Sequence, residues 1–297
     1  MKLGIIGGSG LYQLEGLADT REVTLQTPFG QPSDPYIHGR LGSAEVVFLP
    51  RHGRGHRLLP SEINHKANIW GFKKLGVSAV MSVSAVGSLR EGLRPRDVVL
   101  PDQYYDRTKG ALAHTFFGNG IVAHVSFGDP TCKALRESIA AVVTETIRDL
   151  ALGDAVRLQR TGTYVNMEGP AFSTRAESQV YRRLGFDIIG MTSLPEAKLC
   201  REAELCYQSM AMVTDYDCWY ASEEGVSVEM IVATLQANTQ LAKEVIRRLV
   251  PRLTATSPSC ACGHALQGAI MTSPDAVPRA AYDALEPIVG RYLKRPA

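Results

Sequence analysis

Apolar positions along the chain follow two patterns that alternate from end to end. Short runs of β-branched and other apolar residues predict strands, and apolar residues recurring at helical spacing predict helices. The predicted strands are Leu3–Ile6, Glu45–Leu49, Val77–Ser84, Asp97–Leu100, Thr161–Met167, Asp187–Met191 and Tyr207–Thr214. One predicted helix is capped by Ser61, and its residues Ile63, Ala67 and Trp70 lie on one face. The other predicted helices span Thr131–Leu150, Thr174–Leu184, Glu196–Ala203, Val226–Leu249 and Ala276–Tyr292.

This alternation predicts an α/β fold with a central mixed, largely parallel sheet flanked by helices. Residues 109–128 are glycine-rich and predict an excursion from the core, and residues 254–262 predict a loop. Neither segment has the composition of a domain linker, so we expect one domain over residues 1–297. No apolar run is long enough for a membrane helix. The N-terminus is too glycine-rich for a signal peptide, so we expect a cytoplasmic protein with no membrane partner.

Composition and charge narrow the classes of partner. The chain has 297 residues, 32 Lys+Arg against 30 Asp+Glu, and a formal charge of +2. This near-balance argues against a nucleic-acid partner bound through its phosphates, but it allows a small basic pocket for one anion. Six cysteines are far too few for a disulfide scaffold, so the composition favours free thiols.

Polar clusters follow the predicted strands. In open α/β sheets, ligands bind at the carboxyl ends of strands. The clusters at these positions are Gly7–Gly10, Arg51–His56, Ser84–Gly87, Met191–Ser193 and Asp215–Asp217.

The first cluster contains Gly8-Ser9-Gly10, whose amides and hydroxyl suit an anion. It is not a dinucleotide fingerprint, because Gln13 occupies the place of the third glycine, and the Lys of a Walker loop is also absent. A tight turn after the first strand explains the glycines equally well.

The second cluster combines a guanidinium fork at Arg51 with the imidazole of His52, both suited to phosphate oxygens. A solvated loop has the same composition. A zinc site formed by His52, His56 and His65 is disfavoured because neighbouring arginines would repel the cation. We therefore expect no metal at this cluster.

Asp215 and Asp217 lie two residues apart at a strand end and point the same way. Carboxylates so placed can accept hydrogen bonds from an amino group or hold a proton, or they can simply cap a turn. Phe172 suits either stacking on a planar ring or core packing. The C-x-C of Cys260 and Cys262 is too short to define a zinc site by itself.

Taken in order, several motifs resemble the trimeric purine nucleoside phosphorylases, and in particular their 5′-methylthioadenosine phosphorylase branch. The matching segments, between Gly4 and about Leu235, are Gly7–Leu11, Arg51–Arg54, Ala67–Trp70, Gly87–Arg90, Asp106–Thr108, Glu168–Pro170, Arg175–Glu177 and Thr214–Trp219. The resemblance implies a nucleoside-phosphorylase fold and phosphorolysis of 5′-methylthioadenosine to adenine and 5-methylthioribose 1-phosphate.

The resemblance also assigns residues to the site. It implies phosphate binding by Ser9, Arg51, His52, Ser84, Ala85 and Thr192, and base binding by Phe172, Ser173, Thr214, Asp215 and Asp217. The ribose and methylthio group would contact Met191, Val228, Ile231, Val232 and His124, the last lent by an adjacent subunit. Asp215, Arg51 and His52 would carry the catalysis. The implied assembly is a homotrimer or hexamer, with phosphate as co-substrate and neither cofactor nor metal.

Asp215 carries the expected specificity. The branch that acts on 6-oxopurines has Asn at this position, whereas a carboxylate only accepts and therefore suits a 6-amino group and a protonated N7. The alternatives are a methylthioinosine or general purine phosphorylase, a non-catalytic nucleotide-binding protein, and a hydrolase that ignores phosphate. Cys132, Cys200, Cys206, Cys260 and Cys262 resemble the cysteines of archaeal and thermophilic members that form disulfides.

Overall fold

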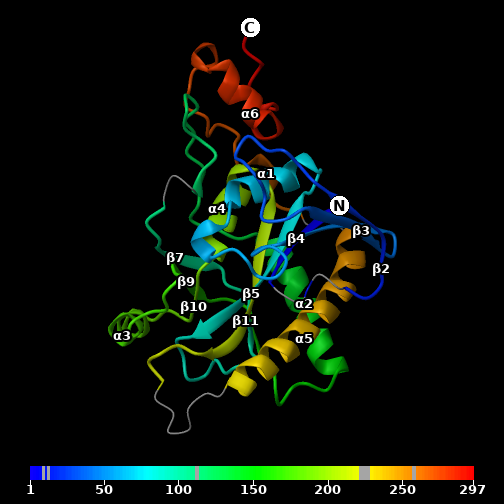
Figure 1. The fold of residues 1–297 in the computed structure, drawn as a ribbon, viewed down its shortest axis with the longest axis vertical. Helices are drawn as coiled ribbons and strands as arrows, with labels where there is room; N and C mark the ends of the chain where they lie inside the picture. The colour runs from blue at the N-terminus through cyan, green and yellow to red at the C-terminus, as the bar shows by residue number, and fades with distance from the viewer. Residues whose placement is uncertain (9–10, 12–13, 111–113, 221–227, 256–258) are drawn as a thin grey trace.

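A mixed sheet runs through the centre of the molecule in the computed structural model (Figure 1). The structure describes residues 1–297 except 9–10, 12–13, 111–113, 221–227 and 256–258, and it describes only the backbone of 228–231 and 254–255. The strands are β1 (Leu3–Gly7), β2 (Leu17–Val23), β3 (Tyr36–Leu41), β4 (Ala44–Pro50), β5 (Ala79–Ser88), β6 (Val98–Val99), β7 (Gln103–Arg107), β8 (Leu158–Gln159), β9 (Thr163–Met167), β10 (Ile188–Gly190) and β11 (Cys206–Tyr216).

Parallel pairs dominate the described sheet, which confirms the expected class. β1 lies parallel between β4 and β5, and β11 runs parallel to β5 along its whole length. β2, β3 and β4 form antiparallel hairpins at one side. β10 pairs antiparallel to β5 and parallel to β9, which continues to β7.

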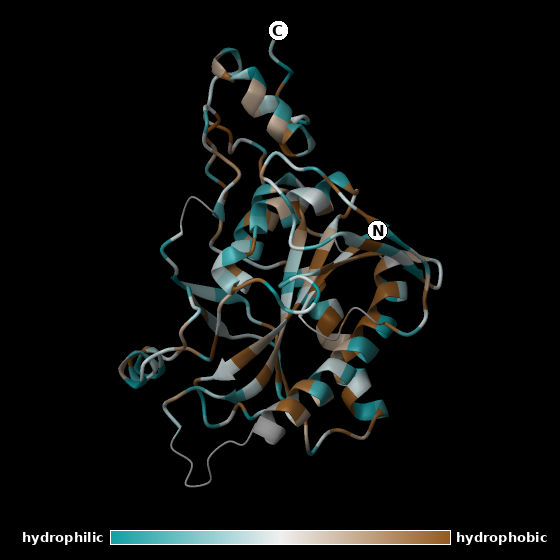
Figure 2. Cartoon of the chain, viewed as in Figure 1, coloured by the Kyte–Doolittle hydropathy of each residue, from teal (hydrophilic) through white to brown (hydrophobic). Residues whose placement is uncertain are grey.

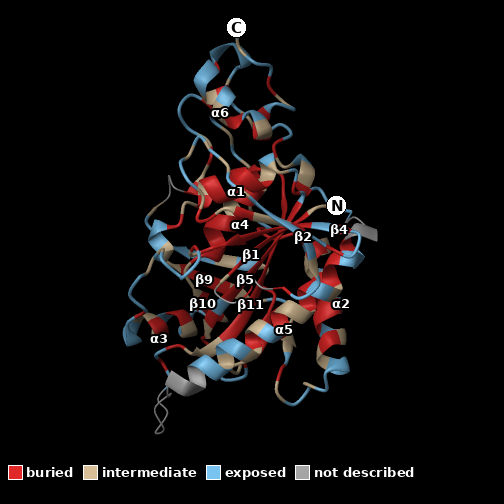
Figure 3. Ribbon diagram, turned by 45° about the vertical axis from the view of Figure 1, so that its right-hand side comes forward, coloured by how far each residue is buried: buried red, intermediate tan, exposed pale blue. Residues whose placement is uncertain are grey.

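Helices cover both faces of this sheet. They are α1 (His65–Lys74), α2 (Lys133–Asp149), α3 (Arg175–Arg183), α4 (Ser193–Glu202), α5 (Val228–Ala255) and α6 (Arg279–Val289). α2 and α5 pack on one face through residues such as Ile139, Val143 and Leu249, and Figure 2 shows the mixed hydropathy expected of such helices. α1, α4 and α6 bury their apolar sides in a second core on the other side (Figure 3). Among the described residues, no helix combines the length and apolarity needed to cross a membrane.

Every predicted strand is present, but four strands were not predicted. β2, with sequence LADTREV, has no buried residue, and β7 and β8 are likewise exposed or half-buried. Polar edge strands of this kind carry no apolar run that a sequence pattern could detect. In β3, glycine and charged positions interrupt the alternation.

The predicted helices are confirmed with shifted ends. Ser61 does not cap α1, because it lies in a 3₁₀ turn at Pro60–Glu62, and the side chain of Asn64 accepts the Ala67 N–H instead. Thr174 caps α3 in a capping box with Glu177. α4 begins at Ser193, before the predicted Glu196, and α5 continues to Ala255 instead of ending at Leu249.

Candidate active site

One edge of the central strand β5 is divided between two neighbours. β11 occupies the opposite edge from Ala79 to Ser88. On the divided edge, β1 pairs with Ala79–Ser82 and β10 pairs with Gly87–Ser88. β1 and β10 run in opposite directions and both end near the middle of β5. The sheet therefore opens beside Val83–Val86, a switch point of the kind where ligands bind in α/β folds.

Ala85 lies at this opening. It is the single exposed residue of β5, although Ser84 and Val86 on either side are buried. Ser84–Gly87 was predicted to follow a strand, and the structure corrects this, because β5 continues to Ser88. The segment is open to a ligand because β1 and β10 end beside it, not because β5 ends there.

Arg51 brings a buried cation to the same opening. It follows β4, and its backbone N–H donates to the Gly7 carbonyl at 2.9 Å, which joins the ends of β1 and β4. Its guanidinium donates to the Val83 carbonyl at 3.0 Å and to the Ser82 hydroxyl at 2.6 Å. Arg51 is therefore fixed against the middle of β5.

Glu196 of α4 is the counterion of Arg51. The Nε of Arg51 lies 2.6 Å from the Glu196 carboxylate, and both side chains are buried. Burial alone would lower the pKa of Arg51, but the charge of Glu196 more than offsets it. The Tyr207 hydroxyl also donates to Glu196 at 2.9 Å. Glu196 was not predicted from the sequence, although its place in the first turn after Thr192 was a signal.

His52 is held neutral. Its Nδ1 lies 2.8 Å from the Leu58 carbonyl, so Nδ1 carries the proton, and its ring stacks on His56 with centroids 4.3 Å apart. Burial lowers the pKa of His52 to about 4, and the charge of Arg51 acts in the same direction. At neutral pH the Nε2 atom therefore has a free lone pair unless a bound anion raises the pKa.

Thr192 enters the opening from the β10 side. It is buried and is the N-cap residue of α4, yet its side chain makes no capping hydrogen bond. Ser84 of β5 is buried, and its hydroxyl lies 3.4 Å from the Ser209 hydroxyl. The helix N-terminus adds positive potential to that of Arg51.

Tyr164 completes the floor of this region and was not predicted. Its hydroxyl is fully buried without a hydrogen-bond partner among the described residues. Burial raises its pKa above the usual range, while Arg51 opposes that shift. A Cβ at Gly190 would lie 2.0 Å from this hydroxyl, so the tyrosine fits only because residue 190 is glycine.

The carboxyl end of β11 carries the acidic pair. Asp215 is paired with Gly87 of β5 and accepts a hydrogen bond from the Thr214 hydroxyl at 2.6 Å. Burial raises the pKa of Asp215, and the charge of nearby Asp217 adds to this, while the Thr214 hydroxyl opposes it. Asp217 is buried, and its Oδ2 has no partner among the described residues. These carboxylates lie at the end of the divided region of β5.

The loop between β9 and α3 contributes a hydroxyl and an aromatic ring. Ser173 is buried with its hydroxyl 3.7 Å from the Met167 sulfur, and its carbonyl accepts from the Cys218 thiol. Phe172 is 82% exposed, which excludes the core-packing alternative and leaves the ring free to stack on a ligand. Met191 is half-buried between Thr192 and Gly190, at the end of β10.

The remaining predicted site residues are Ser9, Val228, Ile231, Val232 and His124. Ser9 lies outside the described residues, and so do the side chains of Val228 and Ile231. Val232 is 46% exposed on α5. His124 lies on the 109–128 excursion, where its backbone N–H donates to the Ala269 carbonyl at 2.9 Å, and this segment runs toward α6 in Figure 1.

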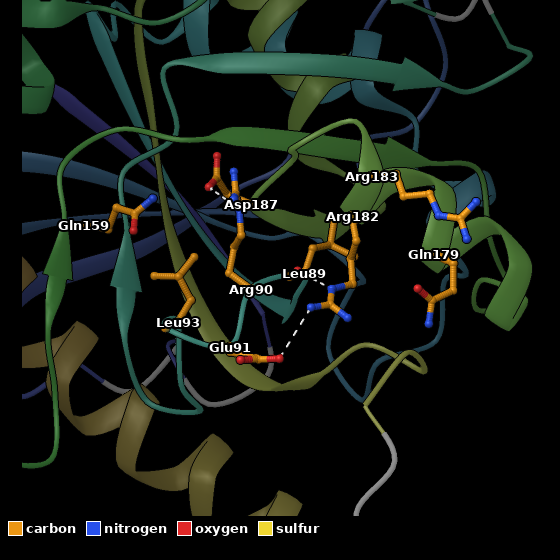
Figure 4. A pocket seen from close by; sticks show the side chains of 10 residues that line it. Leu89, Arg90, Glu91, Leu93, Gln159, Gln179, Arg182, Arg183 and Asp187 are labelled. Atoms are coloured by element: carbon orange, nitrogen blue, oxygen red, sulfur yellow. Dashed lines mark hydrogen bonds and ion pairs between the residues drawn. The ribbon is translucent and has the colours of Figure 1, made fainter.

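A surface pocket of about 760 Å³ lies elsewhere, beside α3 (Figure 4). Its lining includes Arg90, Arg182 and Asp187, and Arg90 pairs with Asp187 at 3.2 Å. None of the predicted site residues lines it. Arg90 and Arg182 form ion pairs with Asp187 and Glu91 at the surface, so neither is a counterpart of the buried Arg51 beside β5.

The match to known proteins extends over most of the chain. The family model described as "Phosphorylase superfamily" matches residues 2–251. The chain is 51% identical over 291 residues to the S-methyl-5′-thioadenosine phosphorylase of Geobacter sulfurreducens, covering 98% of this chain and 99% of that protein. The chain belongs to the S-methyl-5′-thioadenosine phosphorylase family.

Solved structures of this family have the same fold. A methylthioadenosine phosphorylase from an antarctic soil metagenomic library superposes with a TM-score of 0.91 at 44% identity, covering 96% of this chain and 98% of that one. A variant of the adenosine/methylthioadenosine phosphorylase of Schistosoma mansoni, in complex with adenine, gives 0.80 at 33% identity over 91% and 99%. Membership of the methylthioadenosine phosphorylase family confirms the resemblance drawn from the ordered motifs.

Proposed function

We propose that the protein catalyses phosphorolysis of 5′-methylthioadenosine. The bond from C1′ of the sugar to N9 of adenine breaks, an oxygen of phosphate bonds to C1′, and adenine leaves with a proton on its ring. The observation that carries this proposal is the opening beside β5, with a buried arginine at one end and a protonatable carboxylate at the other. Family membership supports the same reaction.

In this proposal, phosphate occupies the opening between the ends of β1 and β10. Backbone groups alternate between the two edges of a strand, and the Val83 carbonyl already faces Arg51 at this edge, so the Ala85 N–H faces the opening as well. Arg51, Ser84 and Thr192 supply the remaining donors, together with Ser9. His52 joins them when the bound anion raises its pKa and Nε2 takes up a proton. These groups hold phosphate below C1′ and stabilise the oxocarbenium-like sugar electrostatically.

Adenine binds at the end of β11. Asp215 holds a proton toward N7, and its raised pKa increases the fraction of the carboxyl that can donate this proton. Protonation of N7 makes adenine a better leaving group. Phe172 stacks on the base, Ser173 and Thr214 line it, and Asp217 accepts from the polar edge. The reaction needs no cofactor, because phosphate is the nucleophile and the proton activates the leaving group.

In this proposal the site is completed in a homotrimer or hexamer, and the reaction takes place in the cytoplasm. His124 is exposed, its backbone N–H donates to the Ala269 carbonyl, and we assign it to the ribose of a neighbouring subunit. Val122 and Met271 beside it are 48% and 66% exposed, and the Met271 N–H donates to the Val122 carbonyl. These apolar side chains provide an interface. Met191, Val228, Ile231 and Val232 surround the sugar and its methylthio group.

The primary test follows adenine release from methylthioadenosine with and without phosphate. We expect release only with phosphate, together with equimolar methylthioribose 1-phosphate. Adenine without phosphate would identify a hydrolase, and binding without turnover would identify a nucleotide-binding protein.

Replacement of Asp215 by Asn tests the basis of specificity. We expect kcat/KM for methylthioadenosine to fall about 100-fold, because the amide lacks the acidic proton and charge of the carboxyl. The rate on methylthioinosine relative to methylthioadenosine should rise, because an amide can donate to O6. Steady-state kinetics on both nucleosides measure this ratio. Asp283→Asn, at an exposed carboxylate on α6, is the matched control, and an unchanged ratio in Asp215→Asn would contradict the assignment.

A further inference from the structure

Four of the six cysteines converge far from the active site. The Sγ atoms of Cys132, Cys206, Cys260 and Cys262 all lie within 4.8 Å of one another. Cys132 is the N-cap residue of α2, Cys206 begins β11, and Cys260 and Cys262 belong to the C-terminal segment before α6. Cys206 and Asp215 are nine residues apart on one strand, so the cluster is about 30 Å from the nucleobase end.

We propose that these four cysteines form a tetrathiolate zinc site. In a tetrahedral site with Zn–S bonds of about 2.3 Å, neighbouring sulfur atoms are about 3.8 Å apart. The observed spread of up to 4.8 Å, with Cys206 and Cys260 at 3.3 Å, brackets this spacing. The four sulfur atoms therefore already lie close to the spacing that a tetrahedral zinc ion requires.

The surroundings of the cluster favour thiolates. The Sγ of Cys132 lies at the N-terminus of a helix of 17 residues, where the helix dipole stabilises negative charge. A divalent cation bound by all four sulfur atoms would hold them as thiolates, which is the form of cysteine that binds zinc.

The position of the cluster gives the ion a structural role. The Cys132 N–H donates to the Tyr207 carbonyl at 2.8 Å, so α2 and β11 already meet here. The C-x-C arrives from the other end of the sequence, and zinc would tie it to both elements. Cys260 is exposed, which provides an entry path, whereas the other three are buried in the core. The short C-x-C spacing gave no zinc signature in sequence, because two ligands come from distant elements.

Metal analysis of the full chain tests this proposal, which does not depend on the proposed function. The protein is expressed with zinc in the medium and purified with a phosphine reductant. We expect about one zinc per chain by mass spectrometry of the metals, released to an indicator dye when a mercurial titrates the thiols. Replacement by cobalt should give the intense visible bands of a tetrahedral tetrathiolate.

Matched variants locate the ligands. Cys206→Ser and Cys262→Ser should each lower zinc occupancy about tenfold, and the thermal transition should fall with it. Cys200→Ala, at a buried thiol outside the cluster, should keep full occupancy. A chelator should lower the thermal transition of the wild type but not of Cys206→Ser.

Thiol counting separates zinc from disulfides. Protein purified without reductant and denatured in chelator should titrate six thiols if zinc holds the cluster. Two titrating thiols and an intact mass four hydrogens lower would show two disulfides and overturn the proposal. Six thiols with no zinc, even after incubation with Zn²⁺, would overturn it as well.

Discussion

At the scale of single residues, the buried pair of Arg51 and Glu196 determines the electrostatics of the phosphate region. Both side chains are almost fully excluded from water and meet at 2.6 Å. A buried ion pair gains little net stability, but removal of one partner leaves an unpaired charge. Glu196 therefore keeps Arg51 ordered and charged before phosphate arrives, at the cost of part of its attraction for the anion.

Glu196→Gln separates these two effects. The amide keeps the shape and an acceptor for Arg51, but removes the counterion. We expect the phosphate-free enzyme to lose about 3–5 kcal/mol of stability. Phosphate should bind about tenfold more tightly, because it becomes the counterion through charge-assisted hydrogen bonds. Thermal unfolding without phosphate measures the loss of stability. The rise in the unfolding temperature on adding phosphate measures its affinity, since a ligand that binds more tightly stabilises the folded protein more.

The control is Glu137→Gln, at an exposed carboxylate that pairs with Arg160 on the surface. It should leave both the stability and the phosphate-induced shift near those of the wild type. A phosphate-induced shift in Glu196→Gln no larger than in the wild type would contradict the role assigned to Glu196.

Residue types predicted the chemistry of the site better than its geometry. The motifs indicated Arg51 and Asp215 directly, because a guanidinium and a carboxylate at strand ends have recognisable uses. Glu196 and Tyr164 were missed, because their positions matter only after α4 has brought Glu196 to Arg51 and β9 has paired beside Gly190 of β10. Arg51 and Glu196 are 145 residues apart in the sequence, and such a contact leaves no local pattern.

At the scale of secondary-structure elements, α1 begins with a buried histidine that the proposed reaction does not use. His65 is the first residue of α1, and its Nδ1 has no partner among the described residues. Burial lowers the pKa of His65 to about 3, with smaller contributions from His114 and Arg51. The N-terminus of α1 also disfavours a positive charge at this position.

The pKa of His65 predicts acid sensitivity. The pKa of a histidine in the unfolded chain is about 6.5. Below that pH, His65 binds a proton in the unfolded chain but stays neutral in the folded protein. Stability therefore falls as the pH drops from about 6.5 toward 3, by up to about 1.4 kcal/mol per pH unit from this group. Between pH 7 and pH 5, we expect the free energy of unfolding of His65→Phe to fall by about 2 kcal/mol less than that of the wild type.

Urea unfolding at both pH values measures the difference. The exposed His264 provides the control, because His264→Phe removes a histidine without removing a buried one. Equal losses of stability in His65→Phe and in the wild type would show that this imidazole does not remain neutral in the folded protein.

Elements were predictable where burial was continuous. β1, β5 and β11 are buried along nearly their whole length, so their apolar runs predicted them in the right order. β2 lacks such a run because it lies at the sheet's edge with its side chains in solvent. The ends of helices depended on capping contacts, such as the Asn64 cap of α1, that several polar residues could have made equally well.

At the scale of the whole molecule, the proposed site needs a residue from a second subunit. The described residues proposed to bind phosphate lie beside β5, whereas His124 follows Ala123, which is bridged to Ile270. The proposed trimer brings His124 of one subunit to the Asp215 of the next. The two residues would then act together although they belong to different chains.

Subunit complementation tests this arrangement. Trimers composed only of Asp215→Asn subunits, or only of His124→Ala subunits, should both be impaired. In a random equimolar mixture, three quarters of the trimers are hybrids with one intact site of three, so about a quarter of wild-type activity should return. Refolding the two variants together and assaying methylthioadenosine measures the recovery. Activity equal to the average of the separate variants would place His124 within its own subunit's site.

Ala85 has a consequence for how this enzyme can be dissected. Its proposed contribution to phosphate binding is the main-chain amide where β1 and β10 both end, and it has almost no side chain to remove. Alanine-scanning mutagenesis removes side chains and therefore cannot detect the contribution of this backbone amide. A change to the backbone is needed instead. Replacing the Ala85 amide by an ester through semisynthesis would measure how much this N–H contributes to turnover.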